Sequence, residues 1–259
     1  MNVEEVDILG VNIFSGGWNS FIDICNKILS SNKKCSLIIS ATSVHGVIEA
    51  QSDEVYKEIL NNSFIAHPDG RPLMFFGKMT GEKKIEQIKG PEVLPKICKM
   101  TAQRNINHFF YGGKEGVAEV LARRMQERYP GLRVSGYYCP PFRDLTYKEK
   151  KDIIKQINET GTDIVWVGLS TPKQEKWAYE FRKKLNVKLI FTVGAAFDFH
   201  TDNLDLAPQW TTQFYIEWLY RLIKEPKRLW KRYFKIVPMF LYYASKQIIK
   251  EKISNSKRR

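Results

Sequence analysis

The stretch FIAHPDGRPLMF, residues 64–75, places Asp69 and Gly70 directly behind a short apolar run. A carboxylate near its reference pKa of about 4 is ionised at pH 7 and is competent as a general base. An Asp-Gly pair also forms a turn without any ligand, because glycine accepts positive φ and aspartate hydrogen-bonds its neighbouring backbone. Taken alone, this stretch favours the turn.

The stretch VGLSTPKQEKW, residues 167–177, leads from a strand directly into a helix. Thr171 suits the N-cap, Pro172 the first helical position, and Gln174 the capping-box position three residues after the cap. The free N–H groups and the dipole of a helix start also bind anions, and Lys173 and Gln174 are close enough to reach a diphosphate. One helix start can serve both purposes, so both interpretations stay open.

Two further stretches place polar groups or glycines behind an apolar run. In SATSVH the candidates are Ser40, Thr42 and His45, each of which a helix cap or a satisfied loop position also explains. In YGGKEG, Gly112 and Gly113 permit close approach of a phosphate or ribose. Tight packing of a helix on a strand is the simpler explanation of these glycines, because the stretch has neither the G-x-G-x-x-G nor the Walker pattern.

The first 200 residues, to which these stretches belong, alternate β-branched or aromatic runs with amphipathic segments, as the βα units of a mostly parallel sheet do. In KEGVAEVLARRMQERYP, for example, Val117, Leu121 and Met125 recur at helical spacing. The runs predicted as strands are residues 6–14, 35–40, 63–67, 106–112, 132–136, 163–169 and 188–194. Ligands bind beyond the carboxyl ends of the strands in such α/β sheets, so we expect the four stretches along one edge.

The charge of the chain is concentrated at its C-terminal end. The 259 residues are 43% hydrophobic, which indicates a globular protein, and carry a net charge of +13. In residues 216–259, thirteen Lys and Arg stand against three Glu, so this segment accounts for +10 of that charge. We therefore predict an α/β core, residues 1–205, and a basic, aromatic-rich helical appendage, residues 206–259, with helix breaks at Pro226 and Pro238.

The appendage interleaves Lys and Arg with aromatic residues, and three interpretations fit parts of this pattern. The aromatic residues are Trp218, Tyr220, Trp230, Tyr233, Phe234, Phe240, Tyr242 and Tyr243. A solvated basic helix explains the charge alone. Nucleic-acid binding uses cations on phosphates and aromatics on bases, yet no RNA- or DNA-binding motif accompanies them. A membrane-surface helix needs cations for the headgroups and aromatic residues at interfacial depth, so we expect an anionic membrane surface as partner and no nucleic acid.

The sequence does not support metal, disulfide or membrane-spanning classes. The four cysteines stand far apart without a C-x-x-C pair, and the four histidines form no metal-binding pattern, so we expect reduced thiols, no metal site and no cofactor. No apolar stretch approaches the ~20 residues of a spanning helix. MNVEEVDILG carries two glutamates where a signal peptide has positive charge, so we expect a cytoplasmic protein.

Six segments of the chain, which contain parts of these stretches, are similar to a known protein family. In order, the segments are PDG, YGGKEGVAEVLARRMQERYPGLRVSGYYCPPF, VWVGLSTPKQEKWAYE, VGAAFDF, LAPQW and IEWLYRLIKEPKRLWKRY. Together they resemble the WecG/TagA/CpsF glycosyltransferase family. The similarity extends from about residue 7 to about residue 235, and the PKQE and EWLYRL–EPKRL–RY blocks are its most specific parts.

The resemblance implies a bacterial enzyme with a Rossmann-like α/β fold, for which we expect a mostly parallel sheet with helices on both faces. Such an enzyme moves a sugar, an N-acetylhexosamine such as N-acetylmannosamine or another hexose, from a UDP-sugar onto a polyprenyl-diphosphate-linked sugar. The reaction belongs to cell-surface polysaccharide or wall-polymer synthesis and does not depend on a bound metal. The basic appendage is implied to bind the inner face of the cell membrane, and a homo-oligomer is left open.

Carried over to this chain, the resemblance implies Asp69 as the general base and Gln174 as an active-site glutamine. Arg221, Arg228 and Arg232 fall in the segment that is implied to fold over the active site. We hypothesise inverting transfer by direct displacement, in which Asp69 takes the proton of the acceptor hydroxyl. The N-terminus of the PKQE helix and the cations of the tail stabilise the negative charge of the departing UDP.

The chain departs from the family pattern at three places. Where the family has T-x-N, this chain has SAT at residues 40–42, so the asparagine is absent. Gln87 and Leu206 stand where the family has arginines. An arginine at a departing diphosphate is worth several kcal/mol in a dry site, and Lys89 or a tail arginine is a candidate substitute. Gln87 is kept as a substrate-binding candidate. The departures keep two alternatives open, a non-catalytic nucleotide-sugar-binding or scaffolding protein at the membrane and an RNA-binding α/β protein.

Overall fold

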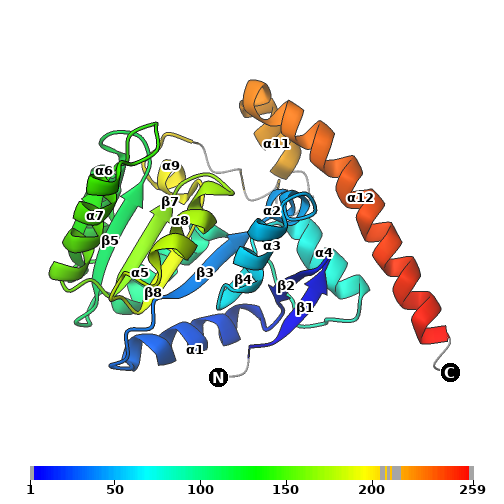
Figure 1. Ribbon diagram of the computed structural model, residues 1–259, viewed down its shortest axis with the longest axis horizontal. Helices are drawn as coiled ribbons and strands as arrows, with labels where there is room; N and C mark the ends of the chain where they lie inside the picture. Colours follow the sequence, from blue (N-terminus) through cyan, green and yellow to red (C-terminus); the bar gives the residue numbers. More distant parts are fainter. Residues whose placement is uncertain (1–2, 205–207, 209–210, 212–216, 257–259) are drawn as a thin grey trace.

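The computed structural model describes residues 3–204, 208, 211 and 217–256, and its centre is a six-stranded parallel sheet (Figure 1). The strands are β3 (Leu37–Thr42), β4 (Ile65–Pro68), β5 (Asn107–Gly112), β6 (Arg133–Tyr138), β7 (Ile164–Gly168) and β8 (Leu189–Thr192). Their order across the sheet is β4-β3-β8-β7-β5-β6, and each neighbouring pair is parallel. Six of the seven predicted strands are therefore confirmed.

Helices cover both faces of this sheet. The described helices of the chain are α1 (Gly17–Ser30), α2 (Val44–Glu49), α3 (Glu54–Asn61), α4 (Arg71–Met79), α5 (Gly90–Thr101), α6 (Val117–Arg128), α7 (Tyr147–Glu159), α8 (Lys173–Phe181), α9 (Ala196–His200), α11 (Glu217–Lys224) and α12 (Pro226–Ser256). Trp166 and Phe191 point to one face, with α1, α5, α6 and α9. Val165 and Ile190 point to the other, with α7 and α8. A parallel sheet with helices on both faces is an α/β fold, so the predicted class is confirmed.

Residues 6–14, predicted as one strand, form a hairpin outside the main sheet. β1 (Glu5–Ile8) pairs antiparallel with β2 (Val11–Phe14). Leu9 and Gly10 between them have φ of 57° and 78°, as the central residues of a two-residue hairpin turn require. The prediction was wrong because one of the two turn residues is itself apolar and does not interrupt the run.

The predicted helix break at Pro238 is wrong, whereas Pro226 does begin a helix. α12 continues through Pro238 to Ser256. A proline inside a helix removes one backbone hydrogen bond and favours a bend. Ile236 and Phe240, on either side of Pro238, are buried against the hairpin, α2 and α4, and this packing holds both parts of the helix in place.

α12 is also hydrogen-bonded to the hairpin, alongside which it lies (Figure 1). The Gln247 side chain accepts from the N–H of Leu9 at 2.8 Å and donates to the carbonyl of Asp7 at 3.0 Å. Ala244, one turn earlier, is buried with the hairpin residues. The boundary predicted at residue 205 lies outside the described residues, so the division into core and appendage stays a prediction.

Candidate active site

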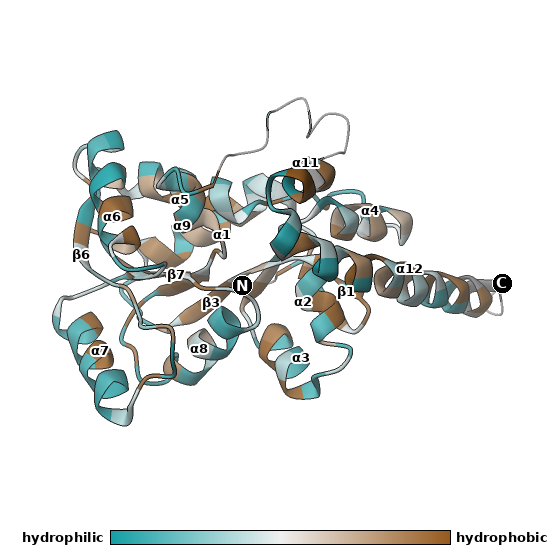
Figure 2. Ribbon diagram, turned by 90° about the horizontal axis from the view of Figure 1, so that it is seen from above, coloured by the Kyte–Doolittle hydropathy of each residue, from teal (hydrophilic) through white to brown (hydrophobic). Residues whose placement is uncertain are grey.

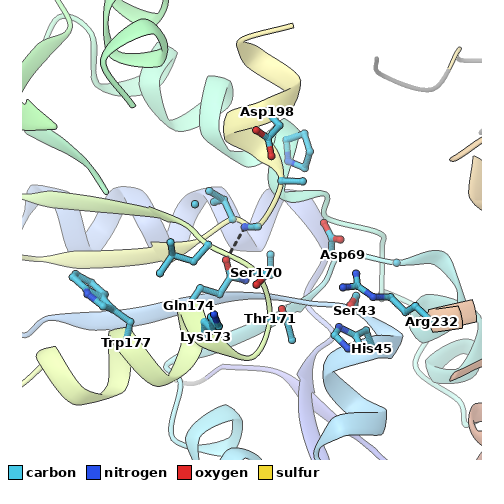
Figure 3. A pocket seen from close by; sticks show the side chains of 18 of the residues that line it. Ser43, His45, Asp69, Ser170, Thr171, Lys173, Gln174, Trp177, Asp198 and Arg232 are labelled. Carbon is cyan, nitrogen blue, oxygen red and sulfur yellow. Dashed lines mark hydrogen bonds between the residues drawn. The ribbon is translucent and has the colours of Figure 1, made fainter. Parts of the chain in front are cut away.

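The carboxyl ends of the central strands open into a cavity of about 1790 Å³. Pockets for one small-molecule ligand have volumes of about 300–1,000 Å³, so this cavity has room for two substrates. The predicted site residues that line it are His45, Asp69, Gln87, Gly113, Lys173, Gln174, Arg221 and Arg232. Figure 3 labels five of them, His45, Asp69, Lys173, Gln174 and Arg232. Segments that are far apart in the sequence thus meet at one edge of the sheet, as predicted.

Positive charge predominates on the cavity wall. Among its described lining residues, nine are Lys or Arg and five are Asp or Glu. Such an excess attracts phosphorylated substrates. The part of the chain that the structure describes contains no group of three or more His, Cys, Asp or Glu side chains that could hold a metal ion.

Asp69 follows β4 directly and is held by hydrogen bonds on its backbone and its side chain. Its N–H donates to the carbonyl of Thr42 at 2.9 Å, which ties it to the end of the neighbouring strand β3. Its Oδ1 accepts from the N–H of Gly90 at 2.7 Å. A Cβ at Gly90 would lie 2.8 Å from the carbonyl oxygen of Val193, so only glycine permits this close approach. The carboxylate is therefore fixed at the cavity wall.

Gly70 does not adopt the positive φ that an Asp-Gly turn suggests. Its φ of −104° and ψ of 142° are extended, and it caps α4 without a side-chain hydrogen bond. A Cβ built on Gly70 would meet only Pro72, at an ordinary 3.6 Å. Neither backbone strain nor the described packing requires glycine here, and Gly70 lies on the cavity wall beside Asp69.

Gln174 is buried and fixed at both ends of its amide, which corrects its predicted place in a capping box. Oε1 accepts from the N–H of Gly194 at 2.9 Å, the bond dashed in Figure 3. Nε2 donates to Oε1 of Glu175 at 2.7 Å. Thr171 also donates to Glu175, at 3.1 Å, and the cap of α8 has no side-chain hydrogen bond. Burial raises the pKa of Glu175, and these bonds oppose that shift. Gln174 thus joins the loop after β8 to α8, where Lys173 lines the cavity.

His45 and Arg232 reach the cavity from α2 and α12. Figure 3 shows the Arg232 guanidinium on the same side of the cavity as His45 and Asp69. Nε2 of His45 lies 3.4 Å from Oε1 of Glu49. Burial, followed by the charge of Arg232, lowers the pKa of His45. Glu49 opposes this shift, and the net effect favours the neutral form of the His45 ring.

Arg221 lies on the same wall, in α11. Its guanidinium is 5.4 Å from the centre of the Phe199 ring, and both residues line the cavity. Arg228 belongs to α12, but its side chain and the whole of Leu206 lie outside the described part of the protein. Of the three predicted tail arginines, Arg221 and Arg232 are thus brought to the cavity.

Gln87 shares a polar corner with Arg71 and Asp69. Its Nε2 donates to the carbonyl of Asp69 at 2.8 Å, and its Oε1 accepts from Nε of Arg71 at 3.2 Å. Lys89 and Arg71 both line the cavity. Cations therefore stand next to Gln87.

Ser40, Thr42 and Gly112 are not among the residues that line the cavity, in contrast to their predicted role. Side chains alternate along β3, so Ala41 and Ser43 face the cavity, whereas Ser40 and Thr42 are buried. A Cβ at Gly112 would lie 2.4 Å from the carbonyl oxygen of Gly168, so packing explains this glycine. Gly113 lines the cavity, but packing explains it as well, because its Cβ would lie 2.6 Å from Val117.

Arg71, Asp198 and Trp177 line the cavity without having been singled out from the sequence. Arg71 directly follows the Asp-Gly pair, and Asp198 follows the last predicted strand, so their places behind strands were an available signal. Trp177 lies one turn after Gln174 in α8, and its ring stacks on that of Tyr111 at 4.3 Å. Helical spacing from Gln174 was the signal for Trp177.

Comparison with known proteins places the chain in a family. The Glycosyl transferase WecG/TagA/CpsF family model matches residues 6–254. The chain belongs to this family. An N-acetylglucosaminyldiphosphoundecaprenol N-acetyl-beta-D-mannosaminyltransferase from Bacillus subtilis (strain 168) is 29% identical over 217 residues, 84% of this chain and 82% of that protein. The protein of the same name from Staphylococcus aureus (strain MRSA252) is 24% identical over 256 residues, 99% of this chain and 97% of that protein.

As a WecG/TagA/CpsF family member, the chain is a glycosyltransferase, and the predicted resemblance is confirmed. The scaffolding and RNA-binding alternatives are thereby set aside. The family match reaches residue 254 and so includes α11 and nearly all of α12. These helices are part of the family pattern of this glycosyltransferase.

Proposed function

We propose that this glycosyltransferase moves an N-acetylhexosamine, such as N-acetylmannosamine, from a UDP-sugar to a polyprenyl-diphosphate-linked N-acetylglucosamine in wall-polymer synthesis. The names of both relatives give this sugar and this class of acceptor. The observation that carries the proposal is Asp69, held at the carboxyl edge of the sheet in a cationic cavity with room for two substrates.

The proposed reaction is a direct displacement with inversion at the anomeric carbon. The acceptor hydroxyl attacks this carbon while Asp69 takes the hydroxyl proton, which contributes about 10²- to 10⁴-fold to the rate. The bond between the anomeric carbon and the diphosphate oxygen breaks, and its electron pair leaves with UDP. Lys173 at the start of α8, together with Arg221 and Arg232, lines the cavity and neutralises the growing charge.

The test combines the purified full-length protein with a panel of UDP-sugars and a prenyl-diphosphate-linked N-acetylglucosamine. We expect UDP release and a disaccharide lipid only when donor and acceptor are both present, with the highest rate for UDP-N-acetylmannosamine. Binding of UDP-sugars without UDP release at any acceptor concentration would contradict the proposal.

We also propose that α11 and α12 bind the surface of an anionic membrane, where the lipid-linked acceptor lies. None of the described helices is long and apolar enough to cross a bilayer. Ile223, Trp230 and Phe234 are exposed apolar residues on these helices, and Lys227 and Lys231 are exposed beside them. Figure 2 shows apolar and polar residues interleaved along α12. Apolar residues at interfacial depth with cations for the lipid headgroups are typical of a membrane-surface helix.

Replacing Trp230 and Phe234 together by serine tests the membrane contact. Neither residue lines the cavity, and truncation of α12 would instead expose the core that Ile236 and Phe240 help to form. We expect affinity for anionic vesicles in a sedimentation assay to fall about tenfold or more, because two large apolar side chains no longer enter the bilayer. Val55→Ser, which removes an exposed apolar side chain of α3, is the matched control. Unchanged sedimentation of the double variant would contradict the contact.

A further inference from the structure

The geometry points to a lipid-chain site in this protein: an apolar arm of the cavity, between α4 and α12, that holds the first isoprene units of the acceptor. This inference rests on the proposed function, because it takes a polyprenyl-diphosphate acceptor as given. It assigns a binding role to side chains that neither the base mechanism nor the membrane contact uses.

One end of the cavity is apolar and open to the outside. Phe75 of α4 and Val237 and Leu241 of α12 line this end and are 43%, 48% and 62% exposed. The rings of Phe76 and Phe240 pack 6.2 Å apart and join the two helices here, as their neighbouring positions in Figure 1 also show. Apolar side chains that line a cavity and remain in contact with water favour an apolar ligand, because the ligand removes their surface from water.

The order of side chains along α12 matches the order of chemical groups in a polyprenyl diphosphate. Arg232 lines the cavity near Asp69, and Ile236, Val237 and Leu241 follow along the same wall. At 1.5 Å per helical residue, Arg232 and Leu241 are about 14 Å apart along the axis. A diphosphate beside Arg232 therefore has an apolar path behind it, which suits the beginning of an isoprenoid chain.

The polar part of the cavity favours the isoprenoid chain of the acceptor over the acyl chain of a bilayer lipid. The arm is continuous with the wall that carries Asp69 and Lys173, so a chain in the arm is attached to a head group inside the site. A diphosphate-linked sugar is such a head group, and its hydroxyl must reach Asp69 for transfer.

A photoreactive farnesyl diphosphate, with the reactive group on its first isoprene unit, tests the arm without any sugar transfer. The full-length protein is labelled in anionic phosphatidylglycerol vesicles, and the adducts are mapped by mass spectrometry. We expect adducts in residues 71–79 and 232–241, and competition by unlabelled farnesyl diphosphate but not by added short-chain phosphatidylglycerol. Val237→Trp and Leu241→Trp, which fill the arm, should each lower labelling about tenfold, as loss of one buried apolar contact predicts.

Ile249→Trp is the matched control, because Ile249 is an exposed residue of the same helix that does not line the cavity. Its labelling should equal that of the unmodified protein. Adducts elsewhere, equal competition by the phospholipid, or equal loss of labelling in all three tryptophan variants would overturn the inference. Labelling in the arm without any transfer to the sugar-bearing acceptor would contradict the proposed function alone, so the two failures are distinguishable.

Discussion

Asp69→Asn is expected to lower kcat for sugar transfer by about 10²- to 10⁴-fold, the usual contribution of a general base. The amide has nearly the shape of the carboxylate, and its oxygen can still accept from the N–H of Gly90, a bond of 2.7 Å in the unmodified protein. An amide does not take up the proton of the acceptor hydroxyl. The loss should therefore appear in kcat, with KM for the UDP-sugar changed by less than about threefold.

Glu58→Gln is the matched control for this prediction, because Glu58 is an exposed carboxylate that does not line the cavity. It should transfer sugar at nearly the normal rate. Binding of the UDP-sugar to the Asp69→Asn variant, measured by calorimetry, separates lost chemistry from lost folding. Near-normal turnover of this variant would show that Asp69 is not the base.

Arg232→Gln is expected to lower kcat by about 10²-fold, the usual loss on removing one group that stabilises developing charge. Arg232 extends from α12 to the side of the cavity that holds Asp69 and His45 (Figure 3). Arg232→Lys should recover part of this loss, because lysine keeps the charge but not the two-pronged contact of a guanidinium with a diphosphate. Steady-state kinetics of the two variants give the comparison.

The pKa of His45 gives this prediction a readout that does not depend on catalysis. Burial and the charge of Arg232 both lower that pKa, so Arg232→Gln should raise it toward the ordinary value. Titration of the His45 ring by NMR measures the shift, and Lys231→Gln, an exposed neighbour outside the cavity wall, is the control. A normal rate with an unchanged pKa would mean that Arg232 does not act at this site.

The predictions from sequence succeeded where the signal is local and failed where tertiary contacts compete with it. The buried strands β3, β4, β5, β7 and β8 are mostly apolar runs, so they could be recognised from the sequence. Helix α12 continues through Pro238, where a break was expected, because Ile236 and Phe240 on either side of this proline are packed in the core. Gln174 has the spacing of a capping box, yet its amide is engaged by Gly194 and Glu175, which no local rule foresees.

The site was predicted to the level of stretches and not of every side chain. All four stretches behind strands contribute to one cavity, because the carboxyl ends of parallel strands meet at one edge. Within SATSVH, however, the alternation of β3 turns Ser40 and Thr42 into the core and leaves Ala41 and Ser43 on the wall. The sequence does not show which alternate residues of this stretch face the cavity, because small and polar residues are mixed in it.

The α/β class and the family could be recognised from the sequence, because strand–helix alternation and short motifs consist of consecutive residues. The resemblance to this family also gave Asp69 as the candidate base. The tertiary structure alone decided that α12 packs on the hairpin and α4 and places Arg232 beside the cavity that contains Asp69. It also decided that Phe75 of α4 and Val237 and Leu241 of α12 line the same cavity. These relations join segments far apart in the chain, and packing of buried side chains, rather than local pattern, brings such segments together.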